Sequence, residues 1–256
     1  MSNIYKAFNN GKAFIPFITC GDPALEVTEK IIYTMVENGA DLIELGIPFS
    51  DPTAEGIIIQ GANARALNNG TTIDKIFCML ENVRKHTSIP IVFMTYANVI
   101  FSYGKESFMK NANNLLIDGV ILSDVPYEEK NEFEPFCKKY NMDIISFIAP
   151  TSKSRIYTIA QNASGFLYCI SSLGVTGMRD NISTDIVEMI NTAKVVSKIP
   201  IAVGFGIKTP HQAKQISNYA DGVIVGSAIV KLCEKYGNEC VKHIGSYVKE
   251  MKSAII

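Results

Sequence analysis

Eight short apolar runs recur along the chain, and longer amphipathic stretches separate them. Within each run the hydrophobicity is continuous rather than alternating, which is the pattern of β-strands that are buried on both faces. The intervening stretches are long enough to hold the crossover helices that parallel strands need. The runs, each closed by Gly, Pro, Asp or Ser, are 14–20, 41–47, 90–95, 119–122, 143–149, 165–171, 200–204 and 222–225.

Helical periodicity fills most of the gaps between these runs. The predicted helices cover 24–37, 73–86, 128–140, 154–161, 184–196, 210–219 and 239–253. Eight β-α units with no Gly/Ser-rich linker between them predict an α/β protein, a (β/α)8 TIM barrel in which residues 1–256 form a single domain with extra short helices. The alternative is a doubly wound open sheet. Its dinucleotide-binding form would need G-x-G-x-x-G after the first strand, which residues 20–23 do not supply.

Composition narrows the classes of partner. The 256 residues are 47% hydrophobic, which excludes a disordered chain, and 24 basic against 25 acidic residues give a net charge of −1. Such a charge offers no excess of cations for nucleic acid or an anionic membrane surface. No apolar stretch approaches the ~18 residues of a membrane helix, and residues 1–12 lack the apolar segment of a signal peptide, so we expect a cytoplasmic protein.

The six cysteines include no C-x-x-C pair, and two of them lie inside apolar runs. This pattern favours reduced structural thiols over a zinc site or a catalytic thiol.

Glycine-rich segments follow three consecutive strands near the end of the chain. They are Gly174 to Gly177, Gly204 to Gly206, and Gly226 with Ser227. Taken singly, each is typical of a tight strand-to-helix turn. In (β/α)8 barrels, however, the loops after strands seven and eight and the start of a short helix often bind phosphate. Backbone N–H groups that glycine leaves accessible, together with a helix N-terminus, therefore predict a phosphate cradle.

The distribution of basic side chains excludes several kinds of chemistry. His86, His211 and His243 all fall on predicted helices, away from the carboxyl ends of strands where barrel enzymes place their reactive groups. A histidine-based triad and a three-histidine metal site are disfavoured, and we expect no metal. Lys153 and Lys208 lie in loops rather than on apolar strands, which disfavours a Schiff-base aldolase. Carboxylates and phenols remain as candidates.

Glu44 is the strongest of these candidates. Alternation places it on the same strand face as Leu42 and Gly46, and burial there would raise its pKa towards the range that suits a general acid and base. The structural alternative is a glutamate paired with an arginine or with backbone donors.

Two long connections, 48–72 and 171–184, exceed what a crossover needs, and loops of that length are more often functional than idle. The first contains Asp51 and Glu55, which we expect to lie over the barrel mouth. A turn residue before proline and a solvated charge are the structural alternatives. Tyr96 and Tyr168, at strand positions, are candidate ligand contacts, although an isolated strand tyrosine is more often part of the core.

Together these segments resemble the α subunit family of tryptophan synthase, and the resemblance covers the whole chain. The matching motifs, in order, are FITCGDP at 17–23, ELGIPFSDP at 44–52, YAN at 96–98, DVP at 124–126, GVTG at 174–177, GFGI at 204–207 and GSAIV at 226–230. The resemblance implies retro-aldol cleavage of indole-3-glycerol phosphate to indole and glyceraldehyde 3-phosphate, in tryptophan biosynthesis, without a metal or an organic cofactor in this chain.

The resemblance also implies roles for individual residues. Glu44 matches the catalytic glutamate, Glu55 aligns with a second carboxylate at the indole N–H, and Tyr168 matches an active-site tyrosine. The residues that match substrate contacts are Phe17 and Tyr96 for the indole pocket, Gly177, Gly206, Gly226 and Ser227 for the phosphate, and Thr176 in the closing loop.

A partner is implied as well: a β subunit that contains pyridoxal phosphate, in an α2β2 heterotetramer. The corresponding contact residues are Asp51, Pro52, Asn98, Asp124 and Pro126.

Two positions depart from the pattern of the family. Glu55 replaces the usual aspartate with a side chain that is one methylene longer, and Ser172-Leu173 stand where an Arg-Ser pair is common before the glycine. These departures keep two alternatives open: a weakly active regulatory subunit that mainly activates a β subunit, and another lyase or isomerase of phosphorylated sugars with the same fold.

Overall fold

The computed structural model describes residues 2–170, 184–204 and 206–256. Within these ranges nine strands pair exclusively in parallel, in the order β5-β4-β3-β2-β1-β9-β8-β7-β6. The strands are β1 (Ala13–Thr19), β2 (Ile43–Gly46), β3 (Ile91–Thr95), β4 (Gly119–Leu122), β5 (Asp143–Ile144), β6 (Ser146–Ile148), β7 (Leu167–Ile170), β8 (Ile201–Gly204) and β9 (Gly222–Val225).

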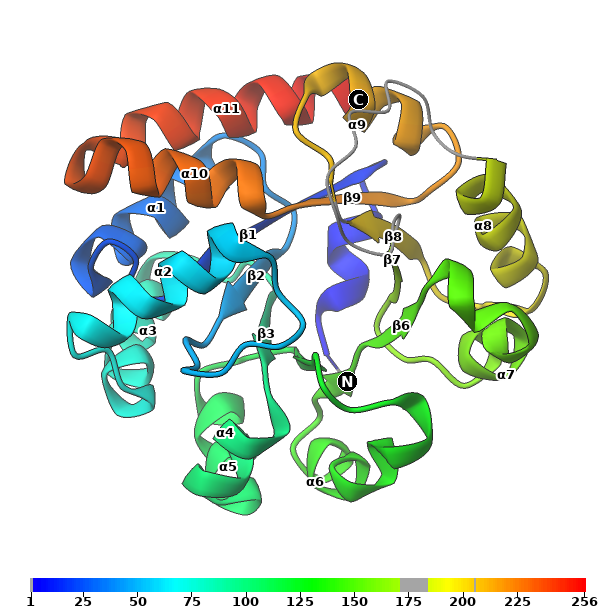
Figure 1. The fold of residues 1–256 in the computed structure, drawn as a ribbon, viewed down its shortest axis with the longest axis horizontal. Helices are drawn as coiled ribbons and strands as arrows, with labels where there is room; N and C mark the ends of the chain where they lie inside the picture. The colour runs from blue at the N-terminus through cyan, green and yellow to red at the C-terminus, as the bar shows by residue number, and fades with distance from the viewer. Residues whose placement is uncertain (1, 171–183, 205) are drawn as a thin grey trace.

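The sheet closes through its fifth predicted run. β5 and β6 are two parts of that run, separated by Ile145; β5 pairs with β4, and β6 pairs with β7. The nine strands therefore occupy eight positions around the barrel, which we call its staves, because β5 and β6 share one position. The predicted (β/α)8 barrel is confirmed. Figure 1 looks along the barrel and shows the helices as an outer ring around the strands.

Eleven α-helices and four short 3-10 helices lie within the described ranges. The α-helices are α1 (Leu25–Glu37), α2 (Ile57–Asn68), α3 (Ile73–His86), α4 (Ala97–Tyr103), α5 (Lys105–Asn114), α6 (Glu134–Lys139), α7 (Ile156–Gln161), α8 (Thr184–Val196), α9 (Pro210–Ser217), α10 (Ser227–Tyr236) and α11 (Cys240–Ile255). The 3-10 helices are η1 (Ile4–Phe8), η2 (Tyr127–Glu132), η3 (Pro150–Arg155) and η4 (Gly237–Glu239). None of the helices in the described ranges is long and apolar enough to cross a membrane.

One predicted helix was wrong, and the sequence predicted no helix in two stretches that do contain helices, 48–72 and 97–114, the second of which holds α4 and α5. The single helix expected at 128–140 is instead η2 followed by α6, which restarts with Pro135 in its first turn. Proline lacks the N–H that a continuous helix would use there, whereas it fits a first turn well. The connection at 48–72 contains α2, which buries only Ala62, Asn63 and Ala66. Because these residues are small or polar, the large apolar stripe that signals a helix is missing. The other long connection, 171–184, lies outside the described residues except at its last position.

The hydrophobic core has two layers. The larger layer lies between the barrel and its helices, and includes Phe93, Phe108 and Ile31. The smaller layer fills the barrel interior, where Ile15 of β1 and Val92 of β3 meet side chains from the other staves and from η1. The parallel register places Phe17, Glu44 and Val92 side by side on β1, β2 and β3. Glu44 therefore shares a level of the barrel interior with apolar neighbours.

All six cysteines lie in described segments and are free thiols. Only Cys78 is exposed. Burial raises the pKa of the Cys20 and Cys169 thiols to about 12, which leaves them uncharged.

Aspartates at the amino ends of three strands bind the strands beside them. Asp41 accepts the N–H of Phe14 at 2.7 Å, Asp118 accepts the N–H of Ile91 at 3.0 Å, and Asp221 accepts the N–H of Ile201 at 3.0 Å. Asp118 also accepts the N–H of Asn3 at 2.6 Å. These N–H groups lie at or near the beginnings of strands, so the carboxylates satisfy donors at the end of the barrel opposite the carboxyl ends of the strands.

Asp118→Ala should lower the free energy of unfolding by about 2 kcal/mol, because it leaves the N–H groups of Ile91 and Asn3 without their acceptor in a buried site. Asp118→Asn keeps one acceptor oxygen and should recover part of the loss. Urea unfolding of the two variants beside the parent chain measures the effect. Equal stability of Asp118→Ala and the parent would contradict the role given to this carboxylate.

Candidate active site

Glu44 is a buried carboxyl group with no hydrogen-bond partner among the described residues. It lies on β2, between β1 and β3, and only 1% of the residue is exposed. Neither carboxylate oxygen has a partner in that part of the chain, so the alternative of a glutamate paired with arginine or backbone donors is wrong for the described structure. Burial, reinforced by the nearby charge of Glu55, raises the pKa of Glu44 to about 8. A carboxyl group in this state can both give and accept a proton near neutral pH.

Tyr168 lies across the barrel on β7 and is also buried. Burial, with a smaller contribution from the charge of Glu44, raises the pKa of its phenol, which is therefore protonated at neutral pH. The phenol occupies space that Gly204 on β8 leaves open: a Cβ at residue 204 would lie 2.4 Å from the Tyr168 oxygen. This close approach explains why a glycine ends β8.

Phe17 lies at the junction of β1, α2 and α10. It packs with Ala62 of α2 and Val230 of α10 in a small cluster of its own. A Cβ at Gly46 would lie 2.7 Å from the end of the Phe17 ring, so the glycine in the ELGIP segment makes room for the ring. Gly226 makes room for the same ring, since a Cβ at residue 226 would lie 3.2 Å from Phe17 Cδ1. The position of the predicted indole-pocket residue therefore depends on glycine at two places.

Glu55 and Tyr96 form a hydrogen-bonded pair. The Tyr96 hydroxyl donates to the Glu55 carboxylate and accepts the N–H of Ala54 at 2.9 Å. Burial raises the pKa of Glu55, and the hydrogen bond from Tyr96 opposes that rise. The Tyr96 ring lies 5.0 Å from the ring of Phe49. Tyr96 is thus both buried and engaged with the second carboxylate, which joins the loop after β2 to the end of β3.

The predicted phosphate residues that the structure describes follow two adjacent strands. Gly206, after β8, has a φ of +82°, a conformation that favours glycine. Gly226 precedes α10, and Ser227 is its first residue, exposed at the helix N-terminus. The N-terminal N–H groups of α10 and the positive end of its dipole suit an anion. Thr176 and Gly177 lie outside the described residues.

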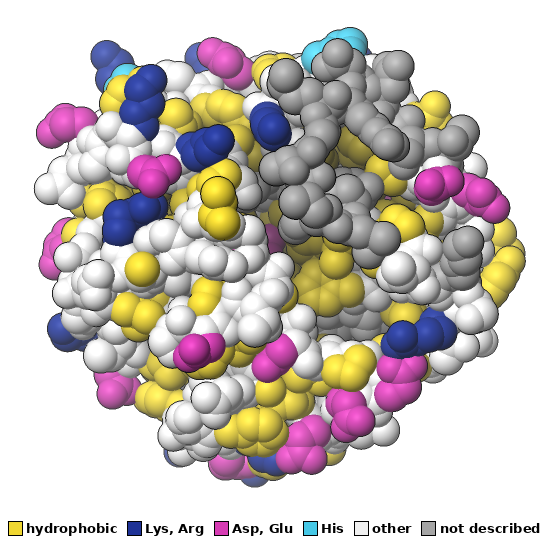
Figure 2. Space-filling view, in the orientation of Figure 1, with side chains coloured by type: hydrophobic (Ala, Val, Ile, Leu, Met, Phe, Trp, Pro, Cys, Tyr) yellow, Lys and Arg dark blue, Asp and Glu magenta, His cyan; other side chains and the backbone are white. Residues whose placement is uncertain are grey.

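A cavity of about 430 Å³ opens beside Tyr168. Sequence reasoning missed Ser123, which lines this cavity and whose hydroxyl is buried without a hydrogen-bond partner in the described ranges. A serine after a strand gives no distinctive signal. Figure 2 shows hydrophobic side chains at the centre of this face of the molecule. Other lining residues are Ala54, Met94, Phe147, Ile170, Lys130 and Arg155.

The predicted partner-contact residues all lie in segments that follow β2, β3 and β4. Asp51, Asn98, Asp124 and Pro126 are exposed, and Pro52 is half-buried. Asp124 and Pro126 also line the cavity, and the Asp124 carboxylate accepts the N–H of Ala97 at 2.9 Å. Asp124 therefore has a structural role at the beginning of α4. Among the described residues, no group of three His, Cys, Asp or Glu side chains could hold a metal ion.

Comparisons with known proteins agree with this arrangement. The family model for the tryptophan synthase alpha chain matches residues 5–256. The chain is 43% identical to the tryptophan synthase alpha chain of Lacticaseibacillus casei, over 100% of this chain and 96% of that protein. It is 44% identical to the alpha chain of Thermoanaerobacter sp. (strain X514), over 95% of this chain and 94% of that one.

Solved structures show the same relationship. Tryptophan synthase subunit alpha from Legionella pneumophila superimposes with a TM-score of 0.90 at 37% identity, covering 100% of this chain and 98% of that chain. A chain from the tryptophan synthase a2b2 complex of Pyrococcus furiosus superimposes with a TM-score of 0.88 at 34% identity, covering 95% and 99%. The protein described here therefore belongs to the tryptophan synthase alpha chain family.

Proposed function

We propose that this chain cleaves indole-3-glycerol phosphate to indole and glyceraldehyde 3-phosphate by a retro-aldol reaction, in tryptophan biosynthesis. The observation that carries the proposal is Glu44: a buried carboxyl group, without a partner in the described ranges, whose pKa is raised to about 8. Leaving such a group unpaired in an apolar interior costs free energy of folding, so its presence favours a functional role. Membership of the alpha chain family supports the choice of substrate and of reaction class.

In this mechanism Glu44 acts first as an acid and then as a base. Its protonated carboxyl gives a proton to C3 of the indole ring, which leaves the ring with a positive charge shared by C2 and N1. The resulting carboxylate then accepts the proton of the glycerol hydroxyl next to the ring. As that O–H bond breaks, the C–C bond to C3 breaks too, its electron pair returns to the ring, and the hydroxyl carbon becomes the aldehyde. Glu44 ends protonated, as it began.

Glu55 stabilises the positive charge that develops at the indole N–H, and Tyr96 orients its carboxylate. Phe17 and Tyr96 form the pocket for the indole ring. Tyr168 is the active-site phenol, and the charge of Glu44 contributes to its raised pKa. Gly177, Gly206, Gly226 and Ser227 bind the phosphate through backbone N–H groups and the N-terminus of α10. Thr176 belongs to the loop that closes over the substrate and engages the second carboxylate.

The chain itself needs no cofactor under this proposal. It assembles with a β subunit as an α2β2 heterotetramer in the cytoplasm, and the pyridoxal phosphate belongs to that partner. The support is the likeness to a chain of the Pyrococcus furiosus tryptophan synthase a2b2 complex. The contact surface under this proposal consists of Asp51, Pro52, Asn98, Asp124 and Pro126, which belong to the segments that follow β2, β3 and β4.

A second candidate is a weakly active subunit whose main role is to activate the β subunit. It is favoured by Glu55, whose carboxylate is already engaged by Tyr96 and whose pKa is raised by burial. Both features make this longer side chain a poorer anion for the indole N–H than a free carboxylate.

Glu44→Gln should lower kcat for indole release by about 10²- to 10⁴-fold, because the amide can neither give nor accept the proton. The dissociation constant of sn-glycerol 3-phosphate, which reports the phosphate site, should stay within about threefold. Glu37→Gln makes the same chemical change at an exposed position at the end of α1 and serves as the control. Turnover in Glu44→Gln equal to that of the control would refute the assignment.

The pH dependence should follow the raised pKa of Glu44. Activity requires the protonated carboxyl, so kcat/KM should fall as pH rises through about 8.

Folding stability should also fall as pH rises. The folded chain keeps the Glu44 proton up to about pH 8, whereas the unfolded chain loses it near 4.5. The free energy of unfolding should therefore decline as pH rises across that window, by at most about 1.4 kcal/mol per pH unit from this group.

Glu44→Gln cannot titrate, and it should lack this part of the slope. Denaturant titrations of the parent and the variant between pH 5 and pH 9 measure it. Parallel curves for the two proteins would show that Glu44 has an ordinary pKa.

Glu55→Asp separates the two candidate functions. If the longer acid is poorly placed, shortening it should raise kcat for indole release by about tenfold or more, since a displacement of about 1 Å can cost ~10²-fold in rate. If the loop has adapted to glutamate, kcat should fall or stay the same. Glu55→Gln, measured in parallel, shows whether the charge is used at all. The assay is indole release by the chain alone and with a β subunit present.

A further inference from the structure

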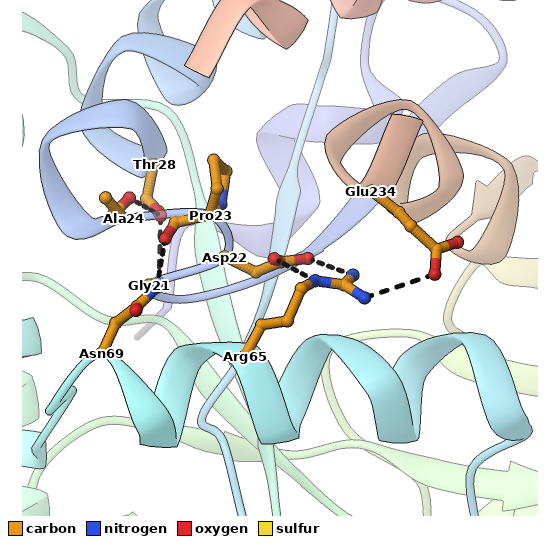
Figure 3. A network of polar contacts seen from close by, with 8 residues as sticks. All are labelled: Gly21, Asp22, Pro23, Ala24, Thr28, Arg65, Asn69 and Glu234. Atoms are coloured by element: carbon orange, nitrogen blue, oxygen red, sulfur yellow. Dashed lines mark hydrogen bonds and ion pairs between the residues drawn. The ribbon is translucent and has the colours of Figure 1, made fainter. Parts of the chain in front are cut away.

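An ion pair between a buried aspartate and a partly exposed arginine links the turn after β1 to α2. Asp22, in that turn, is 2% exposed, and both of its carboxylate oxygens accept hydrogen bonds from Arg65 of α2. The distances are 2.8 Å from Nε and 2.9 Å from Nη2, so the pair is bidentate (Figure 3). A second contact, from Arg65 Nη1 to Glu234 of α10, is longer at 3.4 Å and more exposed. The Asp22 pair is the stronger of the two, because it is bidentate and its carboxylate is buried.

The apolar interface of α2 is modest. Its buried residues are Ala62, Asn63 and Ala66, Ile58 and Ile59 are partly buried against the cluster that contains Phe17, and Ile57 is 84% exposed. Because the fully buried side chains are small or polar, polar contacts also contribute to the orientation of this helix. The Arg65 pair is the central one, and Asn69 adds a hydrogen bond to the carbonyl of Pro23 at 2.6 Å. The second half of α2 is therefore docked on the turn formed by residues 21–23, as Figure 3 shows.

The first half of α2 is joined to the second carboxylate. The helix begins at Ile57, two residues after Glu55, and the Gln60 side chain donates to the carbonyl of Glu55 at 2.7 Å. The backbone of Glu55 is thus tied to the first turn of the helix. A rotation or shift of α2 therefore moves the Glu55 backbone, while Tyr96 holds the carboxylate at the other end of the side chain.

α2 also lies against α10. Ala62 packs with Val230 of α10 and with Phe17, and Glu234 of α10 contacts Arg65. α10 begins at Ser227, at the predicted phosphate cradle. The position of α2 therefore sets how far Glu55 lies from the indole-pocket residue and from the N-terminus of α10.

We propose that Arg65 is a positioning residue: through its bidentate pair with Asp22 it fixes α2, and so places the Glu55 carboxylate relative to Phe17 and the phosphate cradle. This inference rests on the proposed function for its effect on turnover. In this role Arg65 acts through α2 and does not contact the substrate.

The test uses a pair of changes that avoids stranding a buried charge. Asp22→Asn/Arg65→Met removes both charges and keeps similar side-chain volumes, so the chain should fold. Its kcat for indole release should fall by about 10²-fold, the cost of a displacement of about 1 Å. The dissociation constant of sn-glycerol 3-phosphate should stay within about threefold, because backbone groups of Gly206, Gly226 and Ser227 bind the phosphate.

Two further variants sharpen this comparison. Arg65→Lys keeps the charge but loses the bidentate geometry, so its kcat should lie between those of the parent and the double variant. Glu234→Gln removes only the longer, exposed contact, so it should stay within about twofold of the parent. If kcat is unchanged in the folded double variant, the proposal is overturned. It is equally overturned if kcat and phosphate affinity fall together, since that indicates a merely structural role.

Amide hydrogen exchange separates this inference from the proposed function. In the double variant, exchange should quicken by about tenfold or more over residues 49–60, whereas β2 and α10 should exchange as in the parent. If the parent chain releases no indole, the proposed function fails, and this exchange pattern alone then decides whether Arg65 fixes the loop. Unchanged exchange over residues 49–60 would overturn the inference whatever the activity.

Discussion

Closure of the parallel sheet is the constraint on which the rest of this structure depends. Once β5 and β6 join β4 to β7, each stave has two neighbours, and residues in register must share one level of the interior. Phe17, Glu44 and Val92 occupy such a level. Because the neighbours of Glu44 at this level are apolar, closure buries its carboxyl, and this burial, together with the charge of Glu55, raises the pKa of Glu44. The chemistry proposed for this residue is a consequence of strand register.

Glycines at strand ends make the site possible by leaving room for aromatic rings. Gly204 provides the space for the Tyr168 phenol, and Gly46 and Gly226 provide it for Phe17. Glycine lowers strand stability because it has no side chain to pack, so its use at these positions indicates that close approach outweighs that loss. The same face of the barrel carries the buried hydroxyl of Ser123, which has no hydrogen-bond partner among the described residues. At the opposite end of the barrel, polar side chains have a structural role, because Asp41, Asp118 and Asp221 accept hydrogen bonds from neighbouring strands.

Prediction from the sequence succeeded where one local pattern decides the outcome. Continuous apolar runs located every strand, and the helices at 73–86 and 184–196 have the expected boundaries. It failed at 128–140, where Pro135 divides the helix, and at 48–72, where α2 lacks a large apolar stripe. The site followed the same division. Glu44 and Tyr168 could be predicted to lie on buried strands, but nothing local indicated that Tyr96 bonds Glu55 or that Ser123 lines a cavity.

The sequence by itself determined the architecture and the family, because strand hydrophobicity and the motifs at strand ends are local properties of the chain. It also named the carboxylates of the site. Only the tertiary structure decided their environment: that Glu44 has no partner within the described ranges, that Glu55 is held by Tyr96, and that Arg65 reaches Asp22. The physical reason is that burial and ion pairing depend on which distant segments closure of the barrel brings together. Asp22 and Arg65 are 43 residues apart in the chain, and their pairing becomes apparent only when α2 lies against the turn after β1.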